Sequence, residues 1–396
     1  MSEAQYFSSA NEDMFGGIAL DEAAPGFLLR TGTRTLDARG CQAMLPAGGT
    51  ATLHERVNAF FNAAPAGLPL LVGALPFDPT GWDVLYQPVS LMNALPSGGH
   101  STPAFVGDIR SEPAPDAYAR AVEHALDTLN NPYTPLRKVV LARSLHVNAT
   151  APIDPHALAL RLGQDAGVAP FVAALPGDPR RPPAWLVGAS PELLVSRQGL
   201  RVCSHPLAGS ARRSADPVED AAAAEALLGS AKDHDEHRYV VEAIVEALTP
   251  WCSDIRAPKA PELHSTASMW HLGTRIEATL RDPTTPVAAL VAALHPTPAV
   301  CGTPRDDAMY SIRRLEPNPR GFYAGAVGWM DADGDGEWYV AIRCARVQGA
   351  QAQVFAGAGI VTGSQPEFEV AETAAKFTAM LSALGVGHAA STENVS

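Results

Sequence analysis

The sequence has few cysteines and no long apolar run. Five cysteines are spread over 396 residues, with no CxxC pair: Cys41, Cys203, Cys252, Cys301 and Cys344. Their odd number and wide spacing argue against a disulfide framework or a zinc site, so we expect reduced, buried thiols. No apolar run approaches the roughly 20 residues of a membrane span, and the N-terminus lacks the basic-then-apolar pattern of a signal peptide. We therefore expect a cytoplasmic protein with no membrane partner.

Positive charge is also scarce. The chain has 29 Lys and Arg residues against 42 Asp and Glu residues, which gives a formal net charge of −13. This balance argues against nucleic acid or an anionic membrane as a partner, because both are polyanions. An anionic small substrate would need nearby Lys or Arg side chains, or a bound metal ion, to overcome the overall field.

Strand-like and helix-like runs alternate along the chain and indicate an α/β or α+β fold rich in β-sheet. Strands are predicted at 68–77, 138–147, 184–190, 192–197, 325–330, 337–347 and 352–361. Helices are predicted at 114–130, 154–165, 217–229, 232–248, 286–294, 305–314 and 366–384. The stretch PSGGHSTPAF, 96–105, is typical of a loop at a subdomain seam.

The acidic stretch KDHDEH, 232–237, opens one predicted helix. On a helical wheel Asp233 lies within the apolar stripe and Glu236 at its edge, whereas Asp235 lies on the opposite face. Acidic residues at a helix start complement the helix dipole and need no function, and Ser230 is placed to cap this helix. A carboxylate on a buried face, however, needs a partner.

The predicted helix at 366–384 repeats this layout. Glu369 and Glu372 lie near the border of its apolar stripe, with Lys376 between them on the wheel. If the two helices face each other, four carboxylates meet and repel unless a cation lies among them. Ligands that are all oxygen suit Mg²⁺ or another hard ion. The pattern thus indicates a magnesium site, although capping and solvated ion pairs also account for each pair alone.

Three other motifs carry weaker signals. His234 and His237 suggest zinc, but the spacing places no third ligand. The segment 331–342 begins like a calcium-binding EF-hand loop, yet it has Ile342 where a bidentate Glu is required, so a hairpin turn is the better interpretation. The glycine-rich segment 357–363 follows a strand and precedes a helix, and its backbone N–H groups could bind a carboxylate.

The chain resembles the chorismate-utilising enzymes, and among them the isochorismate synthases of siderophore pathways. The resemblance covers residues from about 115 to 385 and is weak over the first hundred. It is carried, in the family's order, by the blocks KVVLARSL, GASPELLVSR, HPLAGSARR, AKDHDEH, MWHLGT, LHPTPAVCGTPR, GAVGWMDADGDGEWYVAIRCA and GAGIVTGSQPEFEVAETAAK.

This resemblance implies a mixed fold in which two antiparallel β-sheets pack as a sandwich with helices outside. We expect flexible tails at 1–20 and 388–396, an N-terminal part of a single fold at 21–110, and a chorismate-binding catalytic core at 111–387. It also implies Mg²⁺ held by Glu236 and Glu372, with Asp233 and Glu369 reaching it directly or through water.

The resemblance further implies that the metal binds the ring carboxylate of chorismate. Residues implied to bind substrate are Gly209, Ser210, His271, Ala299, Val300, Tyr323, Ile342, Arg343, Phe355, Gly357, Gly359 and Lys376. Among them Arg343 and Lys376 would hold its anionic groups, with the backbone at Gly357 and Gly359. For the apolar members plain core packing is an equally simple interpretation.

Two residues would carry the chemistry. Formation of isochorismate adds water at C2 and expels the hydroxyl at C4, which requires one group to accept a proton and another to donate one. Lys138 is the candidate base, and Glu192 the candidate acid, whose pKa partial burial should raise. Without the resemblance, Lys138 would be interpreted as a strand-edge lysine and Glu192 as a surface glutamate.

Individual residues within these blocks indicate which of the family's reactions the chain would catalyse. Anthranilate synthases carry Gln where Lys138 stands, and aminodeoxychorismate synthases carry a nucleophilic Lys where this chain has Ala208. An isomerase that releases isochorismate is therefore favoured over a salicylate synthase that continues by loss of pyruvate. A menaquinone-pathway isochorismate synthase and a non-catalytic binding protein stay open. We expect a monomer whose product a separate isochorismatase or pyruvate lyase consumes.

Overall fold

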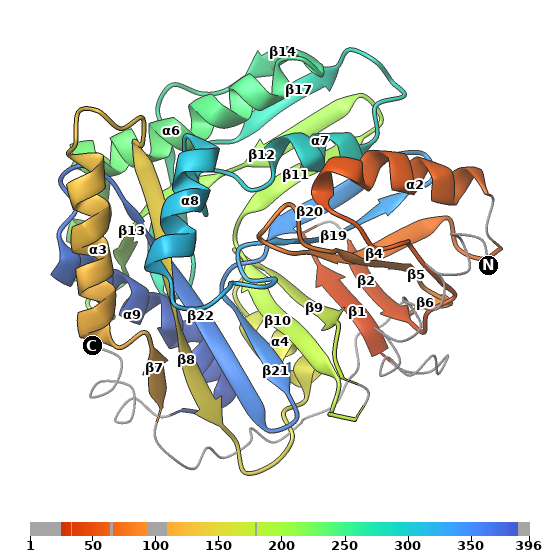
Figure 1. Cartoon of the computed structure of the whole chain (residues 1–396), viewed down its shortest axis with the longest axis horizontal. Coiled ribbons are helices and arrows are strands. Elements are labelled where there is room, and N and C mark those ends of the chain that lie inside the picture. Colours follow the sequence, from red (N-terminus) through yellow and green to blue (C-terminus); the bar gives the residue numbers. More distant parts are fainter. Residues whose placement is uncertain (1–24, 33, 64–65, 93–108, 179, 387–396) are drawn as a thin grey trace.

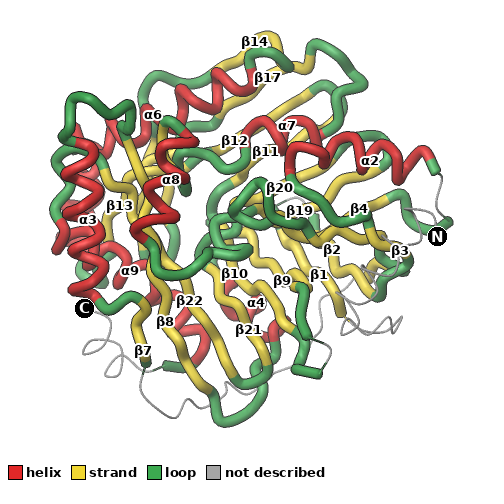
Figure 2. Tube along the Cα trace, viewed as in Figure 1, coloured by secondary structure: helices red, strands yellow, loops and turns green. Residues whose placement is uncertain are grey.

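Two large antiparallel sheets dominate the computed structural model, and helices lie around them (Figures 1 and 2). The structure describes residues 25–386 apart from 33, 64–65, 93–108 and 179. The predicted tails and the predicted loop at 96–105 lie outside the described residues. The predicted fold class, a mixed fold with antiparallel sheets and external helices, is confirmed.

The first sheet has ten strands and contains the longest hydrogen-bonded pair of the described chain, β8 with β22. Its strands, in spatial order, are β18 (Gly302–Thr303), β8 (Lys138–Asn148), β22 (Gln351–Ile360), β21 (Cys344–Gln348), β10 (Ala184–Ser190), β9 (Ala169–Leu175), β1 (Pro25–Arg30), β2 (Thr35–Arg39) and β6 (Ser90–Met92), with β7 (Arg110–Glu112) also pairing with β8.

The second sheet has nine strands, and a third, small sheet has three. The nine strands, in spatial order, are β14 (Cys252–Arg256), β17 (Ile276–Leu280), β12 (Arg201–His205), β11 (Leu193–Gln198), β20 (Gly336–Val340), β19 (Ala326–Asp331), β4 (Leu70–Leu75), β5 (Val84–Gln87) and β3 (Ala43–Met44). The small sheet contains β13 (Leu207–Arg212), β16 (Met269–Gly273) and β15 (Glu262–Ser265). The sequence did not predict this third sheet.

The helices pack on the outer sides of the sheets. They are α2 (Leu53–Asn62), α3 (Pro115–Leu129), α4 (Pro155–Leu162), α5 (Pro217–Gly229), α6 (Ala231–Leu248), α7 (Val287–Leu294), α8 (Arg305–Leu315) and α9 (Pro366–Leu384), with a short 3₁₀ turn η1 (Thr50–Thr52) before α2. Each predicted helix is present, with ends within three residues of the prediction. Two of these helices, α6 and α9, carry the predicted acidic pairs.

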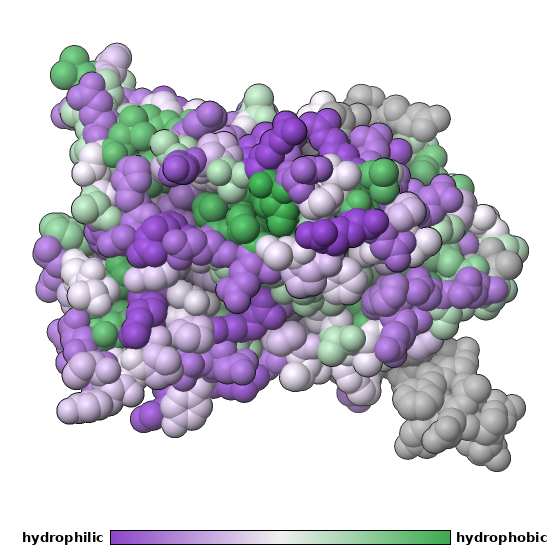
Figure 3. Space-filling view, turned by 90° about the horizontal axis from the view of Figure 1, so that it is seen from above, coloured by the Kyte–Doolittle hydropathy of each residue, from purple (hydrophilic) through white to green (hydrophobic). Residues whose placement is uncertain are grey.

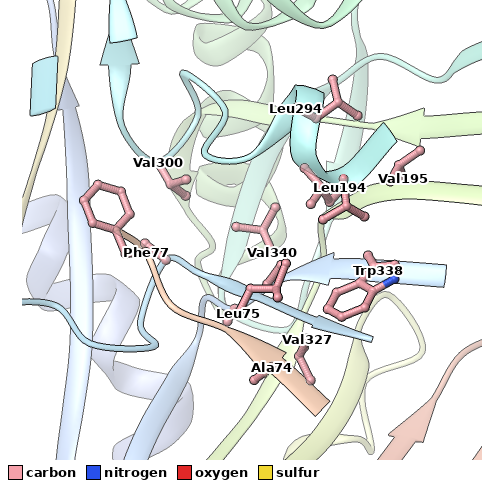
Figure 4. Close-up of a cluster of buried hydrophobic side chains, with 14 of the residues drawn as sticks. Ala74, Leu75, Phe77, Leu194, Val195, Leu294, Val300, Val327, Trp338 and Val340 are labelled. Atoms are coloured by element: carbon pink, nitrogen blue, oxygen red, sulfur yellow. The ribbon is translucent and has the colours of Figure 1, made fainter. Parts of the chain in front are cut away.

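The main hydrophobic core lies between the two large sheets. Figure 4 shows Leu75 of β4, Leu194 of β11 and Trp338 of β20 on the side of the nine-stranded sheet that Leu294 of α7 covers, whereas Val327 of β19 points to the opposite side. The indole of Trp338 is fully buried. Burying a large apolar side chain of this kind stabilises the fold by about 1.5–3 kcal/mol.

A second hydrophobic cluster fills the space between the ten-stranded sheet and helices α4 and α9. Val354 and Ala356 of β22 contact Phe377 and Met380 of α9 there. Because side chains alternate along a strand, the intervening residues of β22 must face the other side of the sheet. This cluster therefore fixes which face of β22 is available for a site.

The single strand predicted at 337–347 is two strands in the structure. The sequence predicts a single strand over 337–347, whereas the structure has β20 in the nine-stranded sheet and β21 in the ten-stranded sheet. Between them Arg343 adopts a left-handed backbone conformation, with φ of 52°. An apolar run cannot reveal this change of sheet, because both strands are buried. The turn places Arg343 where the two large sheets meet.

The acidic segment at 331–342 forms a hairpin turn, as predicted. β19 and β20 pair as antiparallel strands on either side of it. Oδ1 of Asp331 accepts hydrogen bonds from the backbone N–H groups of Asp333 and Asp335, at 3.1 and 2.9 Å. Asp335 in turn accepts from Arg197 at 2.7 Å. Asp331 thus stabilises the turn itself, and Asp335 ties the turn to β11.

Charged and polar residues cover most of the surface seen from above, and hydrophobic residues gather near its centre (Figure 3). The five cysteines are free thiols, and all except Cys41 are buried, as the sequence predicts. Within the described part of the chain, no helix is both long and apolar enough to cross a membrane.

Candidate active site

A cavity of about 60 Å³ lies where β22 of the ten-stranded sheet approaches the small sheet and α9. Most of the sequence-predicted site residues meet here. Those that line the cavity are Glu192, Gly209, Ser210, Glu236, His271, Ala299, Val300, Tyr323, Ile342, Arg343, Phe355, Gly357, Gly359, Glu372 and Lys376. They come from β13, β16, β22, α6, α9 and the loops that join the two large sheets.

The three remaining predicted residues lie just behind the cavity wall. Lys138, at the start of β8, is fully buried, and its Nζ lies 3.0 Å from Oε1 of Glu236. Asp233 contacts the backbone of β13 at Gly209, where a β-carbon would lie 2.9 Å from that of Asp233. Glu369 is buried beside Glu372 on α9.

The glycines of β22 allow side chains of the site to pack closely against the strand. Gly357 and Gly359 belong both to the predicted strand 352–361 and to the glycine-rich segment 357–363, and the structure has them within β22, paired with β8, as the strand prediction requires. The alternation of the strand turns both toward the cavity. A β-carbon on Gly359 would collide with the carboxylate of Glu236 and touch the side chain of Lys138. The absence of a side chain at Gly359 thus allows the Lys138–Glu236 pair to pack against the strand.

Helix α6 begins as the sequence indicates. Oγ of Ser230 accepts a hydrogen bond from the backbone N–H of Asp233, at 3.2 Å, and so caps the helix. Glu236 is 8% exposed, whereas the side chain of Asp235 is 65% exposed and pairs with Arg238 on the solvent side. The helical wheel therefore places the inward and outward carboxylates correctly.

Helix α9 is anchored to the ten-stranded sheet by a buried arginine. Arg143 of β8 donates a hydrogen bond from Nε to Oγ1 of Thr373, at 2.8 Å, and one from Nη2 to the carbonyl of Val370, at 3.1 Å. This anchor presents Glu372 and Lys376 to the cavity. Oε1 of Glu372 accepts from Oγ of Ser210 on β13, at 2.8 Å.

Three lysines neutralise three of the four predicted metal-binding carboxylates. Lys138 pairs with Glu236 at 3.0 Å, Lys232 with Glu369 at 2.9 Å, and Lys376 with Glu372 at 2.5 Å. Lys232 bridges from α6 to α9 and so joins the two acidic helices directly.

The pKa values in this cluster reflect burial and mutual charge. Burial, followed by the charge of Glu372, raises the pKa of Glu369 to about 7. Burial also acts to raise the pKa of Glu372, but the ammonium of Lys376 outweighs it and lowers that pKa. The pKa of Asp233 is raised, chiefly by burial. Two neighbouring acids on α9 therefore differ in how readily they ionise.

The chemistry of these residues fits a hard cation. They offer oxygen donors on two helices that Lys232 joins, and Oε2 of Glu369 is buried without a hydrogen-bond partner among the described residues. In the arrangement seen, lysines lie between the acids, and no group of three or more His, Cys, Asp or Glu side chains in the described chain is placed to hold a metal. The four-carboxylate magnesium site thus stays a prediction.

Glu192 lies between β10 and β11 and is 2% exposed. Its carboxyl group lines the cavity. Burial raises the pKa of Glu192 to about 8, although the cations Lys138 and Arg343 act in the opposite direction. The carboxyl group is therefore mainly protonated at neutral pH and can donate a proton into the cavity.

Arg343 is held in place by His271. Nη2 of Arg343 donates to Nε2 of His271, at 2.9 Å. Burial and the nearby cations Arg343 and Lys376 keep the pKa of His271 well below its usual value. His271 is thus neutral, and its Nε2 is an acceptor. The guanidinium faces the cavity with its charge retained and can bind a carboxylate.

Aromatic and aliphatic side chains form the remaining wall. The rings of Tyr323 and Phe355 stack with centroids 4.9 Å apart and an interplanar angle of 9°. The other apolar members from the prediction are Ala299, Val300 and Ile342. A cavity with a flat apolar side, two cations and a protonated carboxyl group suits a small, planar, anionic ring compound.

Some residues of the site were not assigned from the sequence. Val140, Pro191, Leu207 and Ala356 also line the cavity, and Lys232 was not assigned as the partner of Glu369. Lys232 opens the acidic stretch KDHDEH, so a search for charge partners of the buried acids could have found it. Ala208 lines the cavity as well, so the lysine that replaces it in aminodeoxychorismate synthases would face the substrate.

Comparisons with known proteins agree with this geometry. A sequence model of the family described as chorismate binding enzyme matches residues 92–385. Isochorismate synthase DhbC of Bacillus subtilis is 43% identical over 389 residues, covering 93% of this chain and 96% of that protein. Isochorismate synthase EntC of Escherichia coli K12 is 37% identical, covering 84% of this chain and 86% of that protein.

A solved structure has the same fold. The crystal structure of DhbC from Bacillus anthracis superposes with a TM-score of 0.84 at 40% sequence identity, covering 92% of this chain and 97% of that chain. The family match spans well over half of the sequence, including every residue of the cavity described above. The chain therefore belongs to the chorismate-binding enzyme family.

Proposed function

We propose that this protein is an isochorismate synthase, an isomerase that converts chorismate to isochorismate. The observation that carries the proposal is Glu192, a buried carboxyl group that lines the cavity and whose pKa is raised to about 8. The names of the similar proteins from Bacillus subtilis and Escherichia coli support the same reaction. A vibriobactin-specific isochorismate synthase of Vibrio cholerae, 41% identical, supports a place in siderophore synthesis.

The reaction needs one proton acceptor and one proton donor. Lys138 accepts a proton from the attacking water, whose oxygen forms the new bond at C2. The ring double bond shifts, the bond between C4 and its oxygen breaks, and Glu192 gives its proton to the departing hydroxyl, which leaves as water. An ammonium cannot accept a proton, so the Lys138–Glu236 ion pair must give way before Lys138 acts as base.

The anionic groups of the substrate are held by the cations of the cavity. Arg343, oriented by His271, binds one carboxylate, and Lys376 adds a second positive charge beside it. Ser210 and the backbone of Gly209, Gly357 and Gly359 complete the polar side. The ring lies against the stacked Tyr323 and Phe355. These local charges offset the net charge of −13.

Mg²⁺ would be held by Glu236 and Glu372, with Asp233 and Glu369 reaching it directly or through water. When bound, it would neutralise these acids and bind the ring carboxylate of chorismate. The oxygen-only donors and the bare Oε2 of Glu369 support this assignment.

The test is product analysis. Purified protein is mixed with chorismate, with and without Mg²⁺, and the products are separated by chromatography. Isochorismate that forms only with the metal is the expected result. Salicylate and pyruvate in equal amounts would show that the protein continues to a lyase step. Unchanged chorismate in both samples would contradict the proposed function.

A further inference from the structure

A second, larger cavity adjoins the candidate active site. It has a volume of about 340 Å³ and lies between α4, α9 and the turn that joins β15 to β16. Arg343, Phe355 and Lys376 line both cavities, so these three side chains form the wall between them. Helices α4 and α9 contact each other on the outer side of the ten-stranded sheet (Figure 1).

The two cavities differ in volume, and the difference decides which of them can hold a small-molecule ligand. Sites for small molecules typically measure about 300–1,000 Å³. The outer cavity, at about 340 Å³, is within this range, whereas the inner cavity, at about 60 Å³, is far below it. The outer cavity can therefore receive a ring compound in the conformation seen, before the inner cavity adjusts to it.

The outer cavity has its own cation. Arg161, in the last turn of α4, is half-buried, and its Nε donates to the carbonyl of Ala383 on α9, at 2.7 Å. This bond fixes the guanidinium at the cavity wall. Arg343 stands behind it and carries positive charge on to the inner cavity, whereas the charge of Lys376 is paired with Glu372.

Asp165, the acid at the rim, keeps its negative charge but forms no ion pair with Arg161 among the described residues, because its oxygens are turned to backbone N–H groups. Asp165 accepts hydrogen bonds from the backbone N–H of Gly167, at 2.9 Å, and from that of Ala267, at 2.6 Å. These bonds tie the loop after α4 to the turn between β15 and β16. His264 adds a contact of 3.3 Å to the carbonyl of Gly167. These hydrogen bonds hold the rim of the cavity in a defined conformation.

Apolar side chains line the remaining surface. Leu162, Val168, Ala379 and Met380 contribute to it. An apolar floor with a fixed guanidinium on one side suits a small ring compound that carries carboxylates. A protein with a net charge of −13 repels such an anion at long range, so a local positive site would increase its rate of capture.

We propose that the outer cavity is a capture site for small ring carboxylates, in which Arg161 binds the anionic substrate before it passes Arg343 and Lys376 into the inner cavity. The identity of the substrate rests on the proposed function. The capture step itself involves no bond making or breaking. Arg161 acts on association and takes no part in the chemistry.

The experiment measures the rate of chorismate association by stopped-flow, followed by the intrinsic tryptophan fluorescence of the protein. Arg161→Gln is expected to lower the association rate constant roughly threefold to tenfold and to weaken its dependence on salt. Arg161→Lys, which keeps the charge, is expected to restore most of the rate. The turnover number at saturating chorismate is measured on the same variants, which separates capture from chemistry.

Two further variants make the test specific. Arg201→Gln removes the same charge from an exposed arginine on β12 and is expected to leave association unchanged. Ala379→Trp fills the outer cavity and is expected to slow association more than Arg161→Gln does. Thermal unfolding of each variant verifies that it is folded.

The proposal is overturned if Arg161→Gln associates with chorismate at the wild-type rate and with wild-type salt dependence. It is equally overturned if the variant lowers the turnover number and leaves association unchanged, which would show a structural role. The association rate is measured from chorismate binding and does not require turnover. A wild-type protein that binds chorismate but forms no isochorismate would therefore refute the proposed function and still allow the capture site to be tested.

Discussion

The ammonium group of Lys138 lies 3.0 Å from the carboxylate of Glu236, and both side chains are almost fully buried. The pair joins β8 to α6 directly beside the cavity. It packs against β22 at Gly359, where no side chain is present. The candidate base and a candidate metal ligand are therefore one structural unit, and a change that disturbs either residue should affect both.

Gly359→Ala tests the space that this unit needs. The added methyl group would collide with Glu236 and touch Lys138, so the pair must shift. Overpacking of this kind typically costs about 1–3 kcal/mol of stability. We expect a lower melting temperature and a large loss of turnover, measured by thermal unfolding and product formation.

Gly177→Ala is the matched control, because a β-carbon there would meet no atom within 4 Å. It should leave stability and turnover near the wild-type values. Gly359→Ala that behaved like this control would show that β22 does not limit the position of the pair.

Glu192 sets an upper pH limit for activity. A general acid works only while it holds its proton, and burial raises the pKa of Glu192 to about 8. We expect the turnover number to fall as the pH rises through about 8. Glu192→Gln should bind chorismate and lose turnover by about 10²-fold or more.

Asp235→Asn, on the exposed face of α6, is the control and should keep the wild-type pH profile. A Glu192→Gln variant with normal turnover would show that another group is the acid.

The same carboxyl group should weaken the fold at higher pH. Its pKa is raised from 4.5, the ordinary value of a solvated glutamate, to about 8 in the folded chain. Between these values the folded state holds a proton that the unfolded state has released, so stability falls as the pH rises, by up to about 1.4 kcal/mol per pH unit. We expect Glu192→Gln to gain stability relative to wild type from pH 5 to 8.

Chemical denaturation of both proteins at several pH values measures this difference. A constant difference across this range would contradict the raised pKa.

Lys232 should stabilise the acidic helices when no metal is bound. Its ammonium pairs with the buried Glu369 at 2.9 Å and links α6 to α9. Lys232→Met leaves this carboxylate without its counter-ion, so we expect a stability loss of about 1–3 kcal/mol, since the lysine is partly exposed. Mg²⁺ should restore more stability to the variant than it adds to wild type.

Thermal unfolding with and without Mg²⁺ checks both expectations. Arg238→Gln removes a solvent-exposed pair from the same helix and should change stability little. Equal effects of Mg²⁺ on wild type and Lys232→Met would argue against a metal at these carboxylates.

Sequence patterns correctly predicted the structural features that depend on the spacing of nearby residues. The helical wheel of α6 placed Glu236 inside and Asp235 outside, because a helix repeats every 3.6 residues whatever surrounds it. The predicted hairpin at 331–342 and the buried free cysteines also agree with the structure. The set of residues around the cavity came from the family resemblance, since residues this far apart in sequence show no common periodicity.

Long-range pairing could not be predicted in the same way. The run at 337–347 is apolar throughout most of its length, so nothing in it reveals that the chain changes sheets at Arg343. The strand that contains Gly357 and Gly359 was predicted, but its pairing with β8 and its close approach to Glu236 were not. The partner of Glu369 is a lysine 137 residues away, and only the tertiary fold, in which α6 and α9 both contact β13, brings the two together.

The origin of the new oxygen at C2 tests the roles of Lys138 and Glu192 directly. The reaction is run with Mg²⁺ in water enriched in oxygen-18, and the label is located by mass spectrometry. Lys138 and Glu192 are assigned to a reaction in which water supplies the new oxygen at C2. We expect isochorismate with one labelled oxygen, on C2. Isochorismate without label would mean that the hydroxyl of chorismate is transferred within the molecule, and would contradict the roles given to both residues.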